Sequence, residues 1–129
     1  MDTKNINYLD VGGIRTRFFE KGTGAPLVLI HGGAIGTGSS FDIFTENLDP
    51  LAKRFHVYAL DKLGHGETDN PEMDAHYTIE RMTEHIIAFV RRLGLKRIFL
   101  IGQSRGAYNG VAMCLDHPEL VRALILCNS

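Results

Sequence analysis

The stretch that decides the fold reads Ile98-Phe99-Leu100-Ile101-Gly102-Gln103-Ser104-Arg105-Gly106. A short apolar run leads directly into the pattern Gly-x-Ser-x-Gly, and a helix-like pattern follows it. This context predicts a nucleophile elbow, a strand–turn–helix corner that presents the Ser104 hydroxyl to a substrate. Glycine is expected at positions 102 and 106, because a side chain at either would collide with the neighbouring strand or helix.

Two interpretations of Ser104 compete. In the first it is a nucleophile, which needs a nearby base because a free serine hydroxyl reacts poorly. The helix that follows would point its positive end at an oxyanion, and the N–H of Arg105 would donate to it. In the second, Ser104 is an ordinary helix N-cap. The strand before the motif and the helix after it favour the nucleophile.

The rest of the chain alternates between strand and helix patterns. A hairpin is expected over residues 8–20, with its turn at Gly12 and Gly13. Three more continuous apolar runs, typical of parallel strands buried on both faces, are Pro26–His31, Arg54–Asp61 and Val121–Cys127. Helical patterns cover residues 40–53, 78–93 and 105–116. We therefore predict one α/β domain over residues 1–129, with three layers and a mostly parallel sheet after the hairpin.

A second motif follows the strand that ends near Ile30, and it reads His31-Gly32-Gly33-Ala34. The glycines leave backbone N–H groups free to face a ligand oxygen. Gly33, together with Ala34, would supply the second oxyanion donor. His31 precedes this loop, so we expect it to brace the loop by hydrogen bonding rather than to act as the base.

A third motif is Asp61-Lys62-Leu63-Gly64-His65-Gly66, at the end of another apolar run. A buried Asp61 could orient a histidine, as in a catalytic triad. The favoured alternative is that it accepts hydrogen bonds from backbone donors of the glycine-containing loop. The six histidines show no spacing typical of metal ligands, so no metal site is predicted.

Composition excludes several classes of function. The formal net charge is −1, which gives no electrostatic case for binding nucleic acid or an anionic membrane. No signal segment opens the chain, and no apolar run approaches the length of a membrane span. The expected location is therefore the cytoplasm.

The three motifs, in this order, resemble those of the α/β-hydrolase fold family over residues 5–129. Within it the chain looks most like the small cofactor-free hydrolases, including the meta-cleavage-product hydrolases, which split carbon–carbon bonds in vinylogous diketones. The run Phe55–Gly66 carries that likeness. Arg105 is a departure, since a small or apolar residue is common there. Its guanidinium would bind a substrate carboxylate or pair with an acid of the protein.

The resemblance implies that Ser104 is the nucleophile and that the N–H groups of Gly33 and Arg105 form the oxyanion hole. His31, Gly32, Ala34, Gln103 and Asp61 would support this site. The substrate would be a small ester, lactone or carbon–carbon (diketone) compound, with no cofactor. A non-catalytic ligand-binding or interaction fragment of the same fold is the alternative.

In this family an Asp and a His follow the serine in the chain. After Ser104 the remaining acids are Asp116 and Glu119 and the remaining histidine is His117, all at the far end of the third helix. We therefore expect the N-terminal half of such an enzyme, truncated after the sixth strand and inactive without an Asp and a His from beyond residue 129. Strand 121–127 would be an apolar edge that a second segment, a partner chain or another copy covers.

Overall fold

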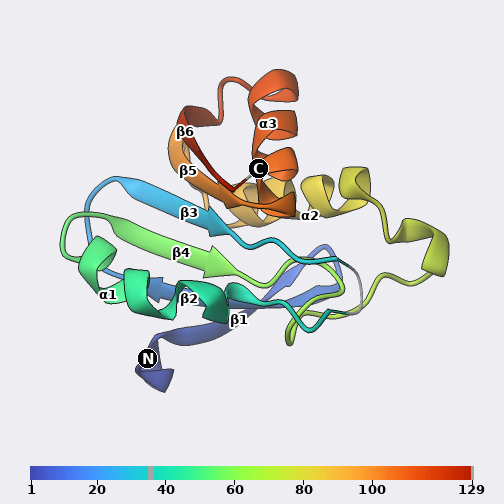
Figure 1. Ribbon diagram of the computed structural model, residues 1–129, viewed down its shortest axis with the longest axis horizontal. Coiled ribbons are helices and arrows are strands. Elements are labelled where there is room, and N and C mark those ends of the chain that lie inside the picture. Colours follow the sequence, from blue (N-terminus) through green and yellow to red (C-terminus); the bar gives the residue numbers. More distant parts are fainter. Residues whose placement is uncertain (35–36, 129) are drawn as a thin grey trace.

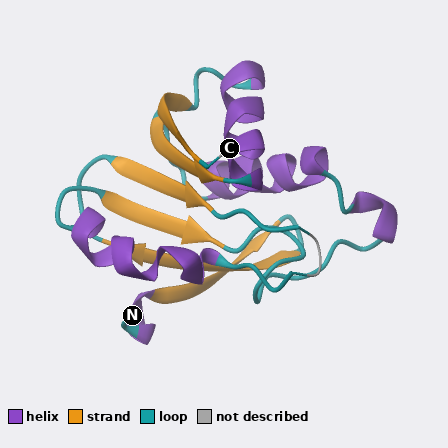
Figure 2. Ribbon diagram, viewed as in Figure 1, coloured by secondary structure: helices purple, strands orange, loops and turns teal. Residues whose placement is uncertain are grey.

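The structure is a computed structural model, and it describes residues 1–34 and 37–128. These residues form a six-stranded sheet in the order β1-β2-β4-β3-β5-β6. The strands are β1 (Ile6–Val11), β2 (Ile14–Lys21), β3 (Pro26–Ile30), β4 (His56–Leu60), β5 (Ile98–Gln103) and β6 (Val121–Cys127). The α-helices are α1 (Thr45–Ala52), α2 (Ile79–Arg92) and α3 (Arg105–Asp116), and short 3-10 turns lie at Thr3–Asn5, Phe41–Phe44 and Asp74–His76. Figure 1 and Figure 2 show the sheet with helices packed along it.

The N-terminal hairpin turns at Gly12 and Gly13, as the sequence predicts. Their φ angles are +59° and +89°, which glycine adopts without steric cost and which two-residue hairpin turns require. β1 and β2 are antiparallel, and so are β2 and β4. β4, β3, β5 and β6 are parallel neighbours. The prediction of a mostly parallel sheet after a hairpin is confirmed.

Apolar side chains pack against both faces of the sheet. On one face Val28 of β3 belongs to a cluster that contains Ile86 and Phe89 of α2. On the other face Leu27 of β3 belongs to a cluster that contains Leu48 of α1. Successive strand residues point to opposite faces, which is why a central strand is a continuous apolar run. Within the described residues, helices therefore cover both faces of the sheet, in the predicted three-layer arrangement.

The prediction of one helix over residues 40–53 needs correction. A 3-10 turn, Phe41–Phe44, comes first, and α1 starts only at Thr45. The Ser40 side chain accepts a hydrogen bond from the N–H of Asp42, and this contact tightens the first turn. α2 begins as predicted, because the Thr78 hydroxyl accepts a hydrogen bond from the N–H of Arg81 at 3.1 Å.

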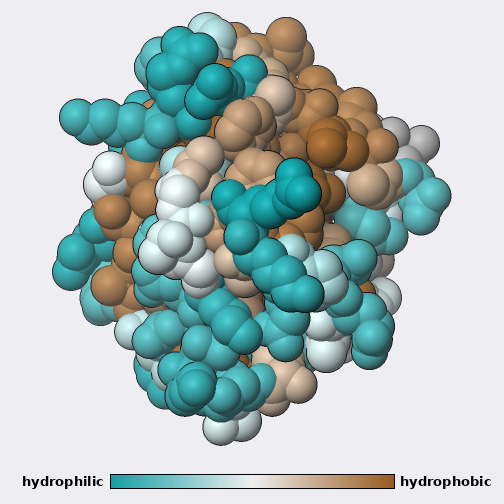
Figure 3. Space-filling model, turned by 90° about the vertical axis from the view of Figure 1, so that its left-hand side faces the viewer, coloured by the Kyte–Doolittle hydropathy of each residue, from teal (hydrophilic) through white to brown (hydrophobic). Residues whose placement is uncertain are grey.

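β6 forms one edge of the sheet, and apolar side chains are exposed there. Ile125 is 58% exposed and Leu126 is 47% exposed, whereas Val28 in the centre of the sheet is fully buried. Leu115 on the neighbouring helix α3 is 75% exposed. Figure 3 shows a continuous hydrophobic area in the upper part of that view, at the level of β5 and β6. The sequence prediction of an apolar edge at residues 121–127 agrees with this surface.

Candidate active site

Three neighbouring strands end at the same edge of the sheet and bring the three sequence motifs together. β3 lies between β4 and β5, and Ile30 at its end pairs with Leu60 of β4 and Gly102 of β5. The motifs of His31, Asp61 and Ser104 follow these three strand ends directly. The carboxyl ends of parallel strands are the usual place for a ligand in an α/β sheet.

Ser104 occupies a backbone conformation that is rare for a residue with a side chain. Its φ angle is +53° and its ψ angle is −119°. The corner is held by the N–H of Ser104, which donates to the Cys127 carbonyl at 2.8 Å, and by the Ser104 carbonyl, which accepts from the N–H of Ala107. Ser104 lies at the N-cap position of α3, but its side chain makes no capping hydrogen bond. The interpretation of Ser104 as an ordinary N-cap therefore fails, and its backbone strain calls for another explanation.

The glycines of the corner are needed because backbone atoms pack closely around it. A Cβ atom on Gly106 would lie 2.3 Å from the carbonyl oxygen of Ile30, and one on Gly102 would lie 2.7 Å from that of Gly106. A Cβ atom on Gly32 would lie 2.7 Å from Cβ of Ser104. The loop after β3 therefore passes directly against the corner that carries Ser104.

The loop after β3 and the corner at Ser104 each have a backbone N–H group without a hydrogen-bond acceptor among the described residues. The N–H groups of Gly33 and Arg105 donate no hydrogen bond to any acceptor in residues 1–34 and 37–128. Gly33 and Arg105 also line one small pocket of about 50 Å³. Ala34 fixes the loop through its carbonyl, which accepts hydrogen bonds from the Thr37 N–H and hydroxyl. Two unpaired N–H groups beside one pocket are suited to binding an oxyanion.

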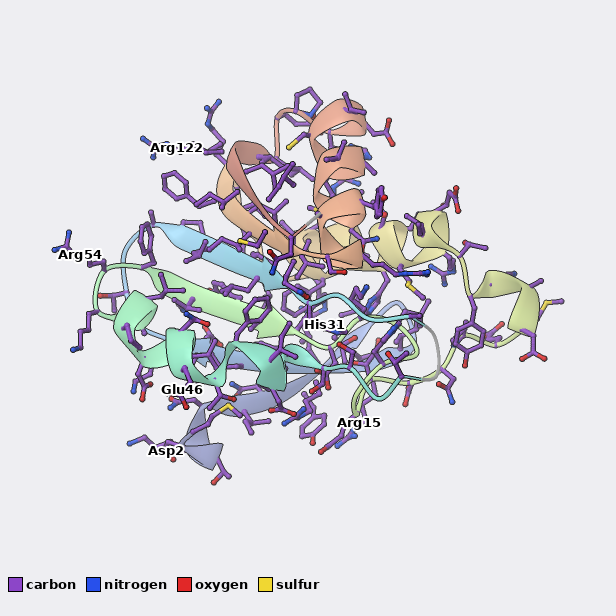
Figure 4. The ribbon with its side chains drawn as sticks, viewed as in Figure 1. Asp2, Arg15, His31, Glu46, Arg54 and Arg122 are labelled. Carbon is purple, nitrogen blue, oxygen red and sulfur yellow. The ribbon has the colours of Figure 1, made fainter. Side chains whose placement is uncertain are left out.

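His31 is fully buried and joins two loops. Its Nε2 accepts a hydrogen bond from the N–H of Lys62 at 3.1 Å, so Nδ1 carries the proton and donates to the Gly32 carbonyl at 2.8 Å. Burial, with a contribution from the positive charge of Lys62, lowers the pKa of His31 to about 3. Figure 4 shows His31 directly beyond the end of β3. A neutral ring engaged at both nitrogens braces the loop and has no nitrogen left to take a proton from Ser104.

Gln103 connects the same loop to β5 from the other side. Its side-chain Oε1 accepts a hydrogen bond from the N–H of Gly32 at 3.1 Å. Two adjacent residues of the elbow, Gln103 and Ser104, are thus in contact with Gly32. This contact ties the loop after β3 to the corner that carries Ser104.

Asp61 is fully buried, and its carboxylate is surrounded by donors. It accepts hydrogen bonds from the N–H groups of Phe41 at 2.9 Å and Glu67 at 2.8 Å, and from Nη1 of Arg17 at 3.2 Å. Burial raises the pKa of Asp61, while these three hydrogen bonds act against that rise. The carboxylate therefore ties β2, the turn before α1 and the loop after β4 together, and it is not available to orient a histidine.

Two charged residues of this region escaped the sequence analysis. Arg17 of β2 is buried and forms ion pairs with Asp61 and Asp42. Lys62 is 1% exposed and lines the same pocket as Gly33 and Arg105. The one feature of the sequence that could have indicated the burial of Lys62 is its position between a buried strand and a compact glycine-containing loop.

No base for Ser104 is found in the described part of the chain. The Ser104 hydroxyl makes no hydrogen bond to any residue in 1–34 or 37–128. His117 contacts Glu119 at 3.3 Å beyond the C-terminal end of α3. A helix of this length spans about 18 Å, so His117 is remote from Ser104. This placement agrees with the expectation that His117, Asp116 and Glu119 serve no catalytic role with the serine.

In residues 1–34 and 37–128, no three His, Cys, Asp or Glu side chains come together as a metal site. Over the same residues, no helix has the length and apolar character needed to cross a membrane.

Sequence comparison identifies relatives of the chain. A family model described as alpha/beta hydrolase fold matches residues 25–129. A 2-hydroxy-6-oxo-6-(2'-aminophenyl)hexa-2,4-dienoic acid hydrolase from Metapseudomonas resinovorans is 36% identical over 124 residues, which are 95% of this chain and 41% of that protein.

Solved structures agree with this relationship. A serine hydrolase involved in carbazole degradation superimposes with a TM-score of 0.85 at 35% identity, covering 94% of this chain and 46% of that one. An epoxide hydrolase from Vigna radiata also gives a TM-score of 0.85, at 27% identity, covering 97% of this chain and 40% of that one. The chain thus spans less than half the length of these relatives. Because the family model matches most of its residues, the chain belongs to the alpha/beta hydrolase fold family.

Proposed function

We propose that Ser104 is the nucleophile of a serine hydrolase that acts on a small-molecule substrate. The observation that carries this proposal is the conformation of Ser104, with φ at +53°, at a strand–helix corner where its side chain caps nothing. Such strain is retained where it serves a function, and here it presents the hydroxyl away from the helix. The family relationship supports the same assignment.

The residues at the corner fit the first chemical step. The Oγ of Ser104 attacks the substrate carbonyl carbon and forms a C–O bond, while the carbonyl electron pair moves onto oxygen. The N–H groups of Gly33 and Arg105 donate to that oxyanion. A base takes the hydroxyl proton and later returns it to the leaving group. For an ester or lactone the leaving group is an alcohol oxygen, and for a diketone it is a carbon.

Among the reactions of this class, we propose hydrolysis of a carbon–carbon bond. The relative from Metapseudomonas resinovorans is named for a hexa-2,4-dienoic acid substrate, and other relatives carry names of the same kind, such as 2-hydroxymuconate semialdehyde hydrolase. The matched segment includes all three strand-end motifs of this chain. Ester and lactone substrates need the same nucleophile and oxyanion donors, so the geometry of these residues supports the broader class as well.

The base and its carboxylate partner are proposed to come from outside residues 1–129. Within the described residues the serine hydroxyl contacts no base, and the chain matches 41% of the length of its relative. The segment that supplies the Asp and the His would also cover the exposed apolar edge at Ile125 and Leu126. The lack of a base also favours the rival proposal, a fragment of this fold that binds ligands or partners without turnover.

A fluorophosphonate probe separates the two proposals. The protein expressed from its complete reading frame is expected to react at Ser104, and the Ser104→Ala variant is expected not to react. The 129-residue chain should react at least about 100-fold more slowly, because general-base catalysis contributes about that much. Size-exclusion chromatography of both proteins should show association of the 129-residue chain.

Labelling that survives the Ser104→Ala change would contradict the nucleophile assignment. Equal labelling rates for the two proteins would show that the base lies within residues 1–129. A complete protein that binds ligands but never reacts would support the rival, non-catalytic function.

A further inference from the structure

Two positive charges beside the candidate active site have no carboxylate partner. Lys62 and Arg105 form no ion pair and no side-chain hydrogen bond with any residue in 1–34 or 37–128. Arg17, the other buried cation of this region, contacts both Asp42 and Asp61. Lys62 is 1% exposed, so its ammonium group has lost most of its contact with water. A buried charge without a partner costs free energy, and an anionic ligand would offset that cost.

Both cations line one pocket, Lys62 as a buried residue and Arg105 as an exposed one at its rim. Its walls include Gly33, Lys62 and Arg105, together with His65 and Asn109. His65 is 4% exposed, and its Nε2 atom has no partner among the described residues; the same holds for Oδ1 of Asn109, which is 1% exposed. Burial, with the positive charge of Arg105, lowers the pKa of Lys62 to about 8. The pocket therefore contains several buried polar groups whose hydrogen-bonding capacity is unused.

The size of the pocket limits the ligand. The pocket measures about 50 Å³, and about 10–15 Å³ on the same measure is enough for one water molecule. A carboxylate fits such a space, and the planar guanidinium of Arg105 can donate two hydrogen bonds to it. The ammonium group of Lys62 is a compact positive charge, and it comes from the motif after β4, directly following Asp61.

We propose that Lys62 and Arg105 form a subsite that binds a carboxylate group of the substrate. The proposal rests on the proposed function, because Gly33 and Arg105 also supply the oxyanion donors at this pocket. A carboxylate held here would lie beside the elbow, because Arg105 follows Ser104 directly in the chain. The subsite thus selects anionic substrates over neutral esters of the same size.

The sequence left two roles open for Arg105, a substrate carboxylate or an acid of the protein. The second role has no candidate among the described residues, where Arg105 makes no ion pair. Arg105 reaches the pocket as the first residue of α3, and Lys62 reaches it from the loop after β4. Two elements distant in sequence therefore contribute one charge each.

Binding of trifluoroacetate to the 129-residue chain, followed by ¹⁹F NMR, tests the subsite without requiring catalysis. We expect saturable binding that weakens at least 10-fold in Lys62→Met and in Arg105→Met. Trifluoroethanol, which carries the same CF₃ group without a charge, is the matched neutral probe and is expected not to bind. Arg122→Met is the matched control, since Arg122 lies at the opposite end of the sheet from His31 (Figure 4).

A stability measurement separates a binding role from a structural one. Lys62→Met is expected to be at least as stable as the parent chain in urea, because it removes a buried, unpaired charge. Lower stability would show that Lys62 supports the fold. Trifluoroacetate binding that is unchanged in both variants, or equal binding of trifluoroethanol, would overturn the subsite.

The outcome is independent of the nucleophile assignment. The Ser104→Ala variant is expected to bind trifluoroacetate as the parent chain does. If fluorophosphonate labelling fails while this binding is lost in Lys62→Met, the subsite stands and the proposed hydrolase function falls. If fluorophosphonate labelling succeeds while trifluoroacetate binding persists in Lys62→Met and Arg105→Met, the hydrolase function stands and the subsite falls.

Discussion

Replacing Gly106 with alanine is expected to destabilise the chain by about 3 kcal/mol or more, a large part of the stability of a small domain. The added Cβ would lie 2.3 Å from the carbonyl oxygen of Ile30 and 2.6 Å from that of His31. Both are backbone atoms of the segment that leads into the oxyanion loop. Neither can rotate away, so α3 must shift relative to β3 and the elbow must open. Urea unfolding followed by circular dichroism measures the loss.

Gly110 of the same helix is the matched control for this change. A Cβ there would lie 2.9 Å from Cδ1 of Leu124, the mobile end of a side chain rather than backbone. Alanine also favours helix over glycine by about 1 kcal/mol. Gly110→Ala is therefore expected to stay within about 1 kcal/mol of the parent chain. Equal effects at the two positions would show that the elbow is not held by close backbone packing. Both variants are compared at one protein concentration, because association through β6 would add to the stability.

Replacing Asp61 with alanine is expected to cost about 3–5 kcal/mol, the usual effect of removing one partner of a buried ion pair. The change leaves the guanidinium of Arg17 without its buried partner. It also leaves the N–H groups of Phe41 and Glu67 without an acceptor. Three segments that meet at Asp61 lose their common contact, so the loops around the site should loosen together. The free energy of unfolding in urea and the amide exchange rates of Phe41 and Glu67 measure these effects.

The exposed ion pair between Lys21 and Asp49 provides the control for Asp61. Its two atoms are 2.8 Å apart, but the Asp49 side chain is 65% exposed. Water replaces the lost partner at such a site, so Asp49→Ala is expected to leave the stability nearly unchanged. A small effect of Asp61→Ala would instead show that Asp61 is not the link between β2, the turn before α1 and the loop after β4.

Local patterns were enough to predict the strands, the strand–helix corner at Ser104 and the position of the glycine-containing loop after β3. The spacing of Gly102, Ser104 and Gly106 marks a tight corner, because neither glycine position has room for a Cβ atom. The continuous apolar run of β3 requires burial on both faces, which only a central strand provides. These features depend on residues close together in sequence, so they could be recognised without the fold.

Contacts between distant segments could not be predicted in the same way. Arg17 and Asp61 are 44 residues apart and meet only because β2 lies beside β4. Lys62 and Arg105 are 43 positions apart in the sequence and line one pocket only because the loop after β4 lies near the start of α3. The division of residues 40–53 into a 3-10 turn and α1 follows from Phe41 donating its N–H to Asp61 and from Ser40 receiving that of Asp42. Tertiary contacts decided each of these outcomes.

The central claim is that the corner at Ser104 presents a reactive side chain at a site that stabilises negative charge. The most direct measurement is the thiol pKa of a Ser104→Cys variant in which Cys114 and Cys127 are replaced by alanine. The N-terminus of α3 and the charges of Lys62 and Arg105 favour a thiolate at this position. The rate of alkylation by iodoacetamide, followed against pH, is expected to give a thiol pKa of about 7 or lower. A pKa at or above about 8.5, or one equal to that of the same chain in urea, would contradict the claim.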